Sequence, residues 1–258
     1  KAGACFGVAG GFERPMWYSL NGIEAKYEYS FNHQNWYTSA EFETKNARKN
    51  VGLFDFSTFS KFDLKGETTH SELQKICTAN IKNEIGKSTY THMLNEDGNI
   101  ETDLTVACIN KNYFRVVSSA ATREHDKYHI QKYLSEDISF TDVTEDICCL
   151  GLFGPKSREM IRKISSDDYS SENFKFGTGK YVNIKNINVW AQRISYVGEL
   201  GFELYVDSKQ ALDLYKILIE EGKNFELSHC GMHAMDIMRM ESGFVHWGHD
   251  ISPEENQY

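Results

Sequence analysis

Hydrophobic and polar positions change their period several times along this chain. Apolar residues that recur every three to four positions predict helices over 38–50, 69–78, 122–135, 209–221 and 232–242. Alternating or short continuous apolar runs predict strands over 61–65, 89–94, 100–109, 113–117, 147–153, 187–196 and 202–206. A further helix is expected after Pro155, since proline suits a first helical turn. Because strands and helices do not alternate as regular βαβ units, the pattern predicts an α+β fold with antiparallel sheets.

Turn and cap residues refine these elements. The turn sequences NEDGN and NKN separate three of the expected strands, which indicates an antiparallel meander. Ser39 is expected to cap the helix over 38–50, and Tyr128 is expected on the buried stripe of the helix over 122–135. Glycines and a proline interrupt the segment 7–18, which predicts an irregular entry into the fold.

Composition limits the classes of protein that this chain can belong to. In 258 residues, 40% hydrophobic and 13% aromatic content is enough to fill a core. The net charge of -9 and the lack of a basic run argue against nucleic-acid binding, and no apolar stretch approaches the roughly 20 residues of a membrane span. The six scattered cysteines form no CxxC pair, which favours reduced thiols. We expect a soluble protein of the bacterial cytoplasm or, in a eukaryote, of the mitochondrial matrix.

Asp103 is the first candidate for a functional side chain. It lies inside a β-rich run, where aspartate is depleted, and Leu104 and Val106 indicate a partly buried neighbourhood. A functional carboxylate and an acid on a polar strand face both remain possible interpretations of this position.

Two further charged positions have simpler explanations than a site. Glu199 lies at the tip of RISYVGELGFELY, where an ordinary hairpin with an exposed acid is the first interpretation. Arg239 lies among methionines in a predicted helix and could form an ion pair there, or hold a planar polar ligand with its fork of donors. The pairs His246/His249 and Cys230/His233 are not completed to a tetrahedral set, so no metal site is expected. GVAGG follows no strand, so no dinucleotide-binding loop is predicted.

Six segments in order along the chain resemble one family. They are GFERPMWY, VGLFDFSTFSKFDLKG, YTHMLNEDGNIETDLTV, LGLFGPKS, RISYVGELGFELY and MRMESGFVHWGHDISPEE. Together they are similar to the glycine-cleavage T-protein family and, more narrowly, to the folate-binding half of dimethylglycine and sarcosine dehydrogenases. The resemblance implies a ring of three parts around a folate. It matches the first two parts here, with 61–147 inserted between 1–60 and 148–258, and it indicates a fragment that lacks a C-terminal barrel and an N-terminal FAD domain.

The resemblance also implies roles for individual residues. Asp103 would lie beside the reactive folate nitrogens, and Glu199 and Arg239 would lie around the pterin. Three aromatic residues would line the pocket: Tyr90, Tyr196 and Tyr205. Ser119 stands where the family has an asparagine that contacts the folate, which is a departure from the family pattern.

The expected function follows from the same resemblance. Tetrahydrofolate would be the cofactor and would be converted to 5,10-methylenetetrahydrofolate with a one-carbon unit from an N-methyl amine. The FAD-binding domain of the full-length chain would be the partner that oxidises the amine. Two alternatives stay open at this point. One is a folate-dependent demethylase that moves an intact methyl group, and the other is a folate-binding regulator without chemistry.

Overall fold

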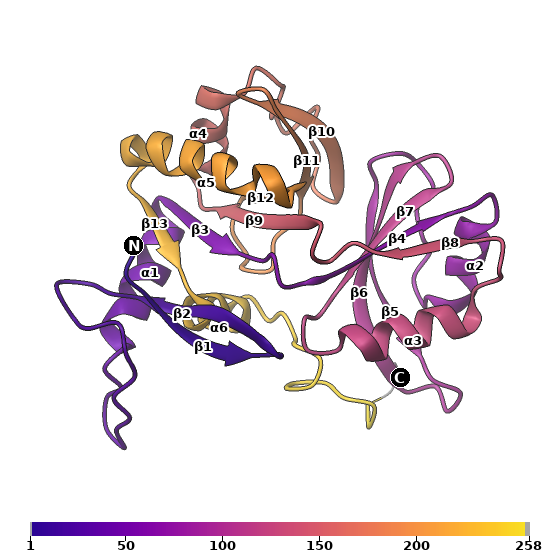
Figure 1. Ribbon diagram of the computed structural model, residues 1–258, viewed down its shortest axis with the longest axis horizontal. Helices are drawn as coiled ribbons and strands as arrows, with labels where there is room; N and C mark the ends of the chain where they lie inside the picture. Colours follow the sequence, from indigo (N-terminus) through magenta and orange to yellow (C-terminus); the bar gives the residue numbers. More distant parts are fainter. Residues whose placement is uncertain (1, 256–258) are drawn as a thin grey trace.

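Two β-sheets define two lobes that lie side by side (Figure 1). The structure is a computed structural model that describes residues 2–255. The larger sheet has the strand order β10-β11-β12-β9-β3-β13, and the smaller sheet has the order β5-β6-β7-β4-β8. Neighbouring strands are antiparallel throughout both sheets, except for the parallel pair of β13 and β3. The predicted α+β class is confirmed.

The elements have the following bounds. The larger sheet contains β3 (Val51–Asp55), β9 (Ile147–Phe153), β10 (Thr178–Ile184), β11 (Ile187–Arg193), β12 (Gly201–Asp207) and β13 (Leu227–Cys230). The smaller sheet contains β4 (Ser60–Lys65), β5 (Ser88–Leu94), β6 (Ile100–Asn110), β7 (Tyr113–Ser118) and β8 (Ser139–Asp142). A separate hairpin pairs β1 (Ala4–Ala9) with β2 (Phe12–Tyr18). The helices are α1 (Tyr37–Lys49), α2 (Thr69–Ile76), α3 (Arg123–Tyr133), α4 (Ser157–Ile164), α5 (Ser208–Gly222) and α6 (Met232–Glu241), with a 3₁₀ turn at Lys223–Phe225.

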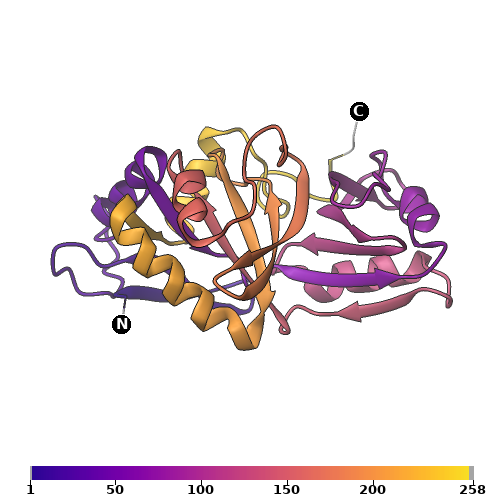
Figure 2. The same cartoon turned by 90° about the horizontal axis from the view of Figure 1, so that it is seen from above.

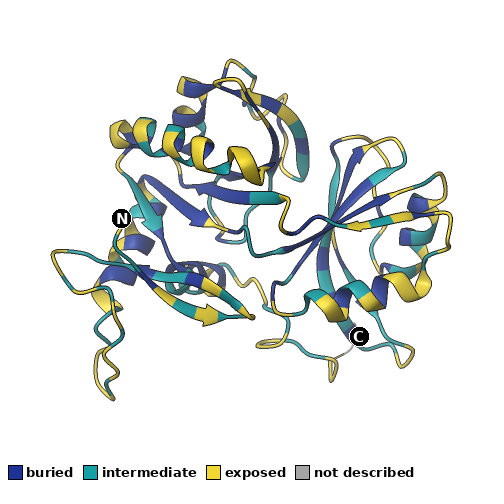
Figure 3. Cartoon of the chain, viewed as in Figure 1, coloured by how far each residue is buried: buried dark blue, intermediate teal, exposed yellow. Residues whose placement is uncertain are grey.

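Each lobe has a hydrophobic core between its sheet and its own helices. In the larger lobe, α4 and α5 pack on one face of the sheet, where Met160 and Leu214 join a cluster with Phe202. In the smaller lobe, α2 and α3 cover one face of the sheet through Leu73 and Ile130. Figure 3 shows buried strands in both lobes and exposed outer sides on α3 and α5. The second face of each sheet is therefore left for contacts elsewhere in the molecule.

These second faces meet in a third hydrophobic cluster, which we call the shared core. Ala107, Ile109 and Val117 of the smaller sheet belong to it, together with residues of β9, β11 and β12, of α1 and of α6. Side chains alternate between the two faces of a strand, so every second residue of β6 points toward the larger lobe. From above, the two lobes follow one another along the long axis of the molecule (Figure 2). The residues of β6 that share a face with Ala107 and Ile109 therefore point toward the larger lobe.

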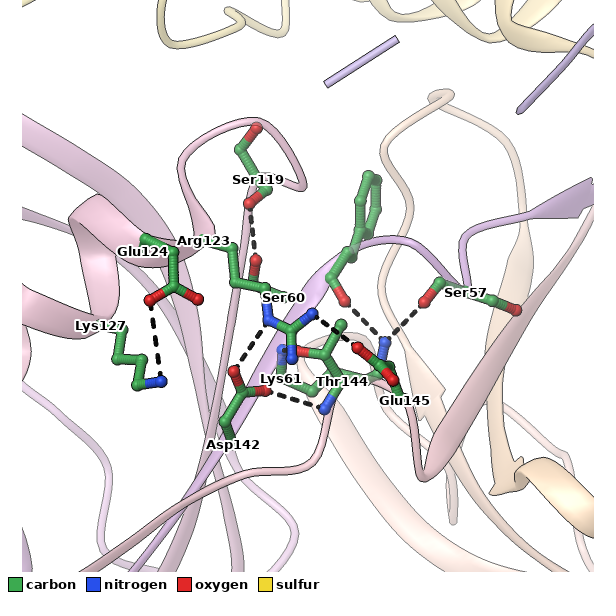
Figure 4. A network of polar contacts seen from close by, with 11 residues as sticks. Ser57, Ser60, Lys61, Ser119, Arg123, Glu124, Lys127, Asp142, Thr144 and Glu145 are labelled. Carbon is green, nitrogen blue, oxygen red and sulfur yellow. Dashed lines mark hydrogen bonds and ion pairs between the residues drawn. The ribbon is translucent and has the colours of Figure 1, made fainter. Parts of the chain in front are cut away.

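The chain passes from the larger lobe into the smaller one at residues 56–59 and returns at residues 143–146. Lys61 lies fully buried where the first crossing enters β4, and its ammonium group donates to the carbonyl oxygens of Ser57 and Phe59 at 2.8 and 2.6 Å. The hydroxyl of Thr144 on the second crossing accepts from the Lys61 backbone N–H at 3.0 Å (Figure 4). The two crossings are thus held to each other by hydrogen bonds. Burial lowers the pKa of Lys61 to about 8.

The prediction of an irregular entry segment is wrong. Residues 4–18 form the β1–β2 hairpin, and Gly10 and Gly11 adopt φ values of 60° and 79° at its turn. These left-handed conformations suit glycine, so the glycines make a tight turn between two strands. A Cβ on Gly10 would lie 3.1 Å from the backbone of Ala121, so the tip of the hairpin reaches the smaller lobe.

Two predictions about the helices are also wrong. Helix α1 begins at Tyr37, and Ser39 is buried inside its first turn and caps nothing. Tyr128 is 73% exposed, whereas Asp126, His129 and Ile130 form the buried side of α3. The buried side of α3 therefore includes polar residues, and an expected stripe of apolar residues does not predict them.

Four strands, β3, β8, β10 and β13, had no counterpart among the elements predicted from the sequence. Within residues 2–255, no helix is long and apolar enough to span a bilayer.

A buried ion pair joins the middle strands of the smaller sheet. Asp63 on β4 and Arg115 on β7 are opposed in register, and two guanidinium N–H groups donate to the carboxylate at 2.7 and 3.0 Å. The hydroxyl of Tyr113 donates to the same carboxylate at 2.5 Å. Both charged side chains are less than 10% exposed. Such a pair contributes little relative to an apolar pair, but removing one partner leaves a buried charge uncompensated.

Asp63→Asn is expected to lower the free energy of unfolding by about 3 to 5 kcal/mol, because Arg115 would lose its buried counter-charge. Urea unfolding followed by circular dichroism measures this loss. Glu41→Gln is the matched control, since it removes one member of the exposed Lys45–Glu41 pair and is expected to cost less than about 1 kcal/mol. Equal losses in both variants would contradict the prediction.

A buried glutamate ties α1 to the hairpin and to α6. The carboxylate of Glu43 accepts the backbone N–H of Tyr18 at 2.6 Å and that of Gly231, the residue before α6, at 2.7 Å. Glu43 is only 2% exposed, and burial raises its pKa to about 7 against the effect of these two hydrogen bonds. The neutral carboxyl group is therefore favoured in the folded chain relative to the unfolded chain. The neutral carboxyl group of Glu43 contributes its full stability below about pH 4.5, and this contribution is lost as the pH rises through 7.

Glu43→Gln removes the buried charge and keeps an oxygen acceptor for one of the two N–H groups. Between pH 4.5 and 8.5, the stability of this variant relative to the wild type is expected to rise by about 1 to 3 kcal/mol. Urea unfolding at a series of pH values gives the difference. The exposed Glu13→Gln variant is the control and is expected to show no such trend. A relative stability that falls with rising pH would overturn the assignment.

Candidate functional site

Asp103 lies in the middle of β6 on the face that points toward the larger lobe. Thr105 and Ala107 share this face because strand side chains alternate, and Ala107 belongs to the shared core. The side chain of Asp103 is half-buried. Burial raises the pKa of its carboxyl group to about 6, the hydrogen bond from Tyr90 lowers it, and the charge of Asp126 raises it. A carboxyl group with this pKa can exchange a proton near neutral pH.

Two tyrosines accompany Asp103. The hydroxyl of Tyr90, on the neighbouring strand β5, donates to Asp103 Oδ2 at 3.1 Å. Tyr196, which follows β11 in the larger lobe, lies near enough for the charge of Asp103 to act on it: burial raises the pKa of Tyr196 to about 12, and Asp103 adds to that rise. The structure therefore brings three of the expected site residues together, one of them from the opposite lobe.

The segment after α6, residues 243–255, crosses from the larger lobe to the smaller one (Figure 1). We call it the C-terminal strap. Its Val245 carbonyl accepts the Tyr196 hydroxyl at 3.2 Å, and its Phe244 ring stacks on Tyr196. Trp247 donates its indole N–H to the Ile100 carbonyl at 3.0 Å. The strap therefore holds Tyr196 on one lobe and the start of β6 on the other.

Arg239 anchors this strap. It is 4% exposed, and its guanidinium donates to Asp236 at 2.7 Å, to the carbonyl of Phe244 at 3.1 Å and to Asp250. Burial lowers the pKa of Arg239, but the contacts with Asp236 and Asp250 raise it more, so the pKa lies above its ordinary value. The ion-pair interpretation of Arg239 describes its contacts in this structure, and its expected role beside a pterin stays a prediction.

Glu199 is engaged in a second ion pair. Its carboxylate accepts from Arg48 of α1 at 2.7 Å, and the same guanidinium bonds to Glu241 at the end of α6. The Glu199 side chain is 20% exposed. Arg48 thus joins the loop that carries Tyr196 to α1 and α6, and the expected contact between Glu199 and a ligand stays a prediction.

Tyr205 lies in the shared core, and Ser119 directly follows Ser118, which is paired with Leu104 next to Asp103. Tyr205 is 3% exposed in the shared core, and its hydroxyl donates to Glu203 at 2.5 Å, so its ring has no free surface to line a pocket. Burial raises the pKa of Glu203 to about 7. Ser119 follows β7, where its carbonyl accepts the hydroxyl of Ser60 at 2.8 Å (Figure 4). The structure places Ser119 near the contact between the hairpin tip and Ala121.

Three residues around the site were missed by sequence reasoning. His92 lies directly opposite Asp103 in the β5–β6 register, and the alternation of THMLN could have indicated its face. Asp126 acts on Asp103 from α3, where it is fully buried. His125 stacks on Trp247 of the strap, and its Nε2 atom lies 2.8 Å from the carboxylate of Glu101. No local sequence pattern indicates these contacts, because they join residues far apart in the chain. Within residues 2–255, no group of three or more potential ligand side chains could hold a metal ion.

The two antiparallel sheets, their helices and the shared core define an α+β domain of two lobes. The family described as the GCVT N-terminal domain matches residues 1–258. The chain belongs to this family.

Curated relatives agree with this assignment. The 4-methylaminobutanoate oxidase (formaldehyde-forming) of Paenarthrobacter nicotinovorans is 37% identical over 100% of this chain and 31% of its own length. Rat mitochondrial dimethylglycine dehydrogenase is 31% identical over 97% of this chain and 29% of its own length. The aminomethyltransferase of Halothermothrix orenii is 33% identical over 86% of this chain and 61% of its own length. The chain thus spans about 30% of the length of the oxidase and the dehydrogenase.

A solved structure supports the fold. The glycine cleavage system aminomethyltransferase T of Bartonella henselae matches with a TM-score of 0.82 and 23% sequence identity. The match covers 99% of this chain and 63% of that protein. The chain is therefore an aminomethyltransferase-like domain with the T-protein fold, related to dimethylglycine and sarcosine dehydrogenases.

Asp126→Asn is expected to lower the pKa of Asp103 below about 6, because it removes a nearby negative charge. Carbon-13 NMR titration of a chain labelled at its aspartate carboxyl carbons measures this pKa, and Asp103→Asn identifies the resonance. Glu136→Gln, which removes an exposed acid, is the control and is expected to leave the value unchanged. An unchanged or higher pKa in Asp126→Asn would contradict the prediction.

Proposed function

We propose that this domain binds tetrahydrofolate between its two lobes and promotes the formation of 5,10-methylenetetrahydrofolate with a one-carbon unit from an N-methyl amine. The observation that carries the proposal is the position of Asp103, half-buried between the lobes with a pKa of about 6. Membership of the aminomethyltransferase-like family supports the reaction class. The bound folate would supply the nucleophilic nitrogens that capture the carbon.

The residues around Asp103 fit a polar, planar ligand. Ser195 Oγ is buried and has no hydrogen-bond partner among the described residues. Ser195 directly precedes Tyr196 in the loop after β11. A buried hydroxyl without a partner requires an explanation, and a heteroatom of a pterin or an ordered water would provide its partner. Tyr90 adds an aromatic ring that is 54% exposed.

Asp103 accepts a proton in the proposed reaction. When a carbon–nitrogen bond to the captured carbon forms, the nitrogen loses a proton: its N–H bond breaks and an O–H bond to Asp103 forms. An ionised Asp103 also stabilises the positive charge of an iminium carbon donor before this step. Tyr196, which the strap holds through Val245 and Phe244, would help to exclude water and to orient the reactants.

The amine donor and its oxidation belong to the proposal as well. The names of the relatives describe an oxidase and dehydrogenases that act on 4-methylaminobutanoate, dimethylglycine and sarcosine, each an N-methyl amino acid. We infer that an N-methyl amino acid is the donor and that an FAD-binding domain of the full-length protein oxidises it to the iminium. The relatives are about three times as long as this chain, which leaves room for such a domain.

Asp103→Asn is expected to retain tetrahydrofolate binding within about tenfold, because it keeps the shape of the side chain. It is expected to slow methylene transfer from formaldehyde by about 100- to 10,000-fold, because an amide cannot accept the proton. Anaerobic calorimetric titration gives the affinity, and single-turnover kinetics with mass analysis of the product gives the rate. Glu136→Gln is the control for both.

The outcomes separate the candidate functions. A folded wild-type chain that does not bind tetrahydrofolate at millimolar concentration refutes the proposal. Binding without any acceleration of transfer by the wild type indicates a regulator, and 5-methyltetrahydrofolate as the product indicates a methyl-transferring demethylase. A transfer rate that Asp103→Asn leaves unchanged refutes the role of Asp103.

A further inference from the structure

The strand next to Asp103 carries a histidine that no role described above uses. In the β5–β6 register His92 is directly opposite Asp103, and Tyr90 is opposite Thr105. Directly opposed residues of an antiparallel pair share a face, with Cβ atoms about 4.5 to 5.5 Å apart. Tyr90 and His92 are two residues apart on one strand, so they also share this face. The three side chains therefore meet on the side of the smaller sheet that faces the larger lobe.

The Tyr90 hydroxyl links the other two side chains. It lies 3.1 Å from Asp103 Oδ2 and 3.2 Å from His92 Nε2, and the two rings meet edge to face with their centres 5.4 Å apart. A hydroxyl has one proton to donate, and an ionised carboxylate can only accept. The proton of Tyr90 therefore goes to Asp103. The contact with His92 then requires that Nε2–H donates to the Tyr90 oxygen, which fixes the tautomer of the imidazole.

We propose that His92 is a positioning residue for the one-carbon reaction: by donating Nε2–H to the Tyr90 oxygen, it directs the Tyr90 proton to Asp103 and so sets the basicity of that carboxylate. The inference rests on the proposed function in that Asp103 accepts the proton of the reaction. Burial lowers the pKa of His92, which favours the neutral imidazole.

The groups that act on Asp103 are few. Tyr90 and His92 face it from β5, Asp126 acts from α3, and Tyr196 faces it from the segment after β11. Of these, Tyr90 lowers the pKa of Asp103 and Asp126 raises it. Without His92, the Tyr90 hydroxyl could rotate to other acceptors, and the carboxylate would lose part of its stabilising bond. We therefore expect the effect of His92 on Asp103 to pass through the Tyr90 hydroxyl, which contacts both side chains.

The test is a carbon-13 NMR titration of Asp103 in the ligand-free chain. His92→Leu is expected to raise the pKa of Asp103 by about 0.5 to 1 unit, the equivalent of one neutral hydrogen bond. His92→Gln, whose amide N–H can donate to Tyr90, is expected to restore most of the wild-type value. Tyr90→Phe is expected to raise the pKa, and His92→Leu is expected to add nothing in the Tyr90→Phe background. The acidic limb of the pH–rate profile of methylene transfer is expected to move with the same variants.

Two results would overturn the inference. One is an unchanged pKa of Asp103 in His92→Leu, and the other is an equal shift by His92→Leu with and without the Tyr90 hydroxyl. Because His92→Gln keeps a polar donor in the strand, it provides a second comparison if His92→Leu does not fold. The titration needs no folate, so its failure concerns His92 alone, whereas a wild-type chain that binds no tetrahydrofolate refutes the proposed function.

Discussion

The packing of the two sheets against each other is the constraint on which the rest of this structure depends. Each sheet buries one face under its own helices, and the second faces meet in the shared core around Phe153, Val117 and Met238. Exposing this core would return large apolar surfaces to water, so the two lobes are held in one arrangement. The crossings at 56–59 and 143–146 reinforce it, because the backbone N–H of Lys61 donates to the hydroxyl of Thr144 and so joins one crossing to the other. The lobes thereby present fixed faces to each other.

The same constraint creates the chemistry at Asp103. A carboxylate at the edge of an apolar interface is partly removed from water, so burial is the main cause of its raised pKa. Tyr90 partly offsets this effect with a hydrogen bond from the next strand. Tyr196 is brought from the other lobe and is held by the strap through Phe244 and Val245. The hydrogen bond and the charge that tune this pKa come from β5 and α3 of the smaller lobe, and the larger lobe brings Tyr196 near the same carboxyl group.

Ion pairs in this protein hold segments in place. Arg239 holds the strap, Arg48 holds the loop before β12 against two helices, and Arg115 joins two central strands. In each case a planar guanidinium binds several acceptors at once, which fixes geometry better than a flexible ammonium group can. The residues that the family resemblance places around a pterin, Glu199 and Arg239, thus already have partners within the chain. A ligand between the lobes would share these charges or displace a partner.

The sequence by itself determined the fold class, the limits of most helices, the meander around β6 and the family, because hydrophobic period and turn residues are local properties. It also singled out Asp103, since an acid inside a β-rich run is unusual. It failed for the hairpin over 4–18, where glycines serve a tight turn, and for Tyr128, because α3 buries polar residues instead. Only the tertiary structure decided that Tyr205 lies in the core, that Glu199 pairs with Arg48, and that His92 and Tyr196 accompany Asp103. These contacts join positions far apart in the chain, and they exist only once the two sheets have packed together.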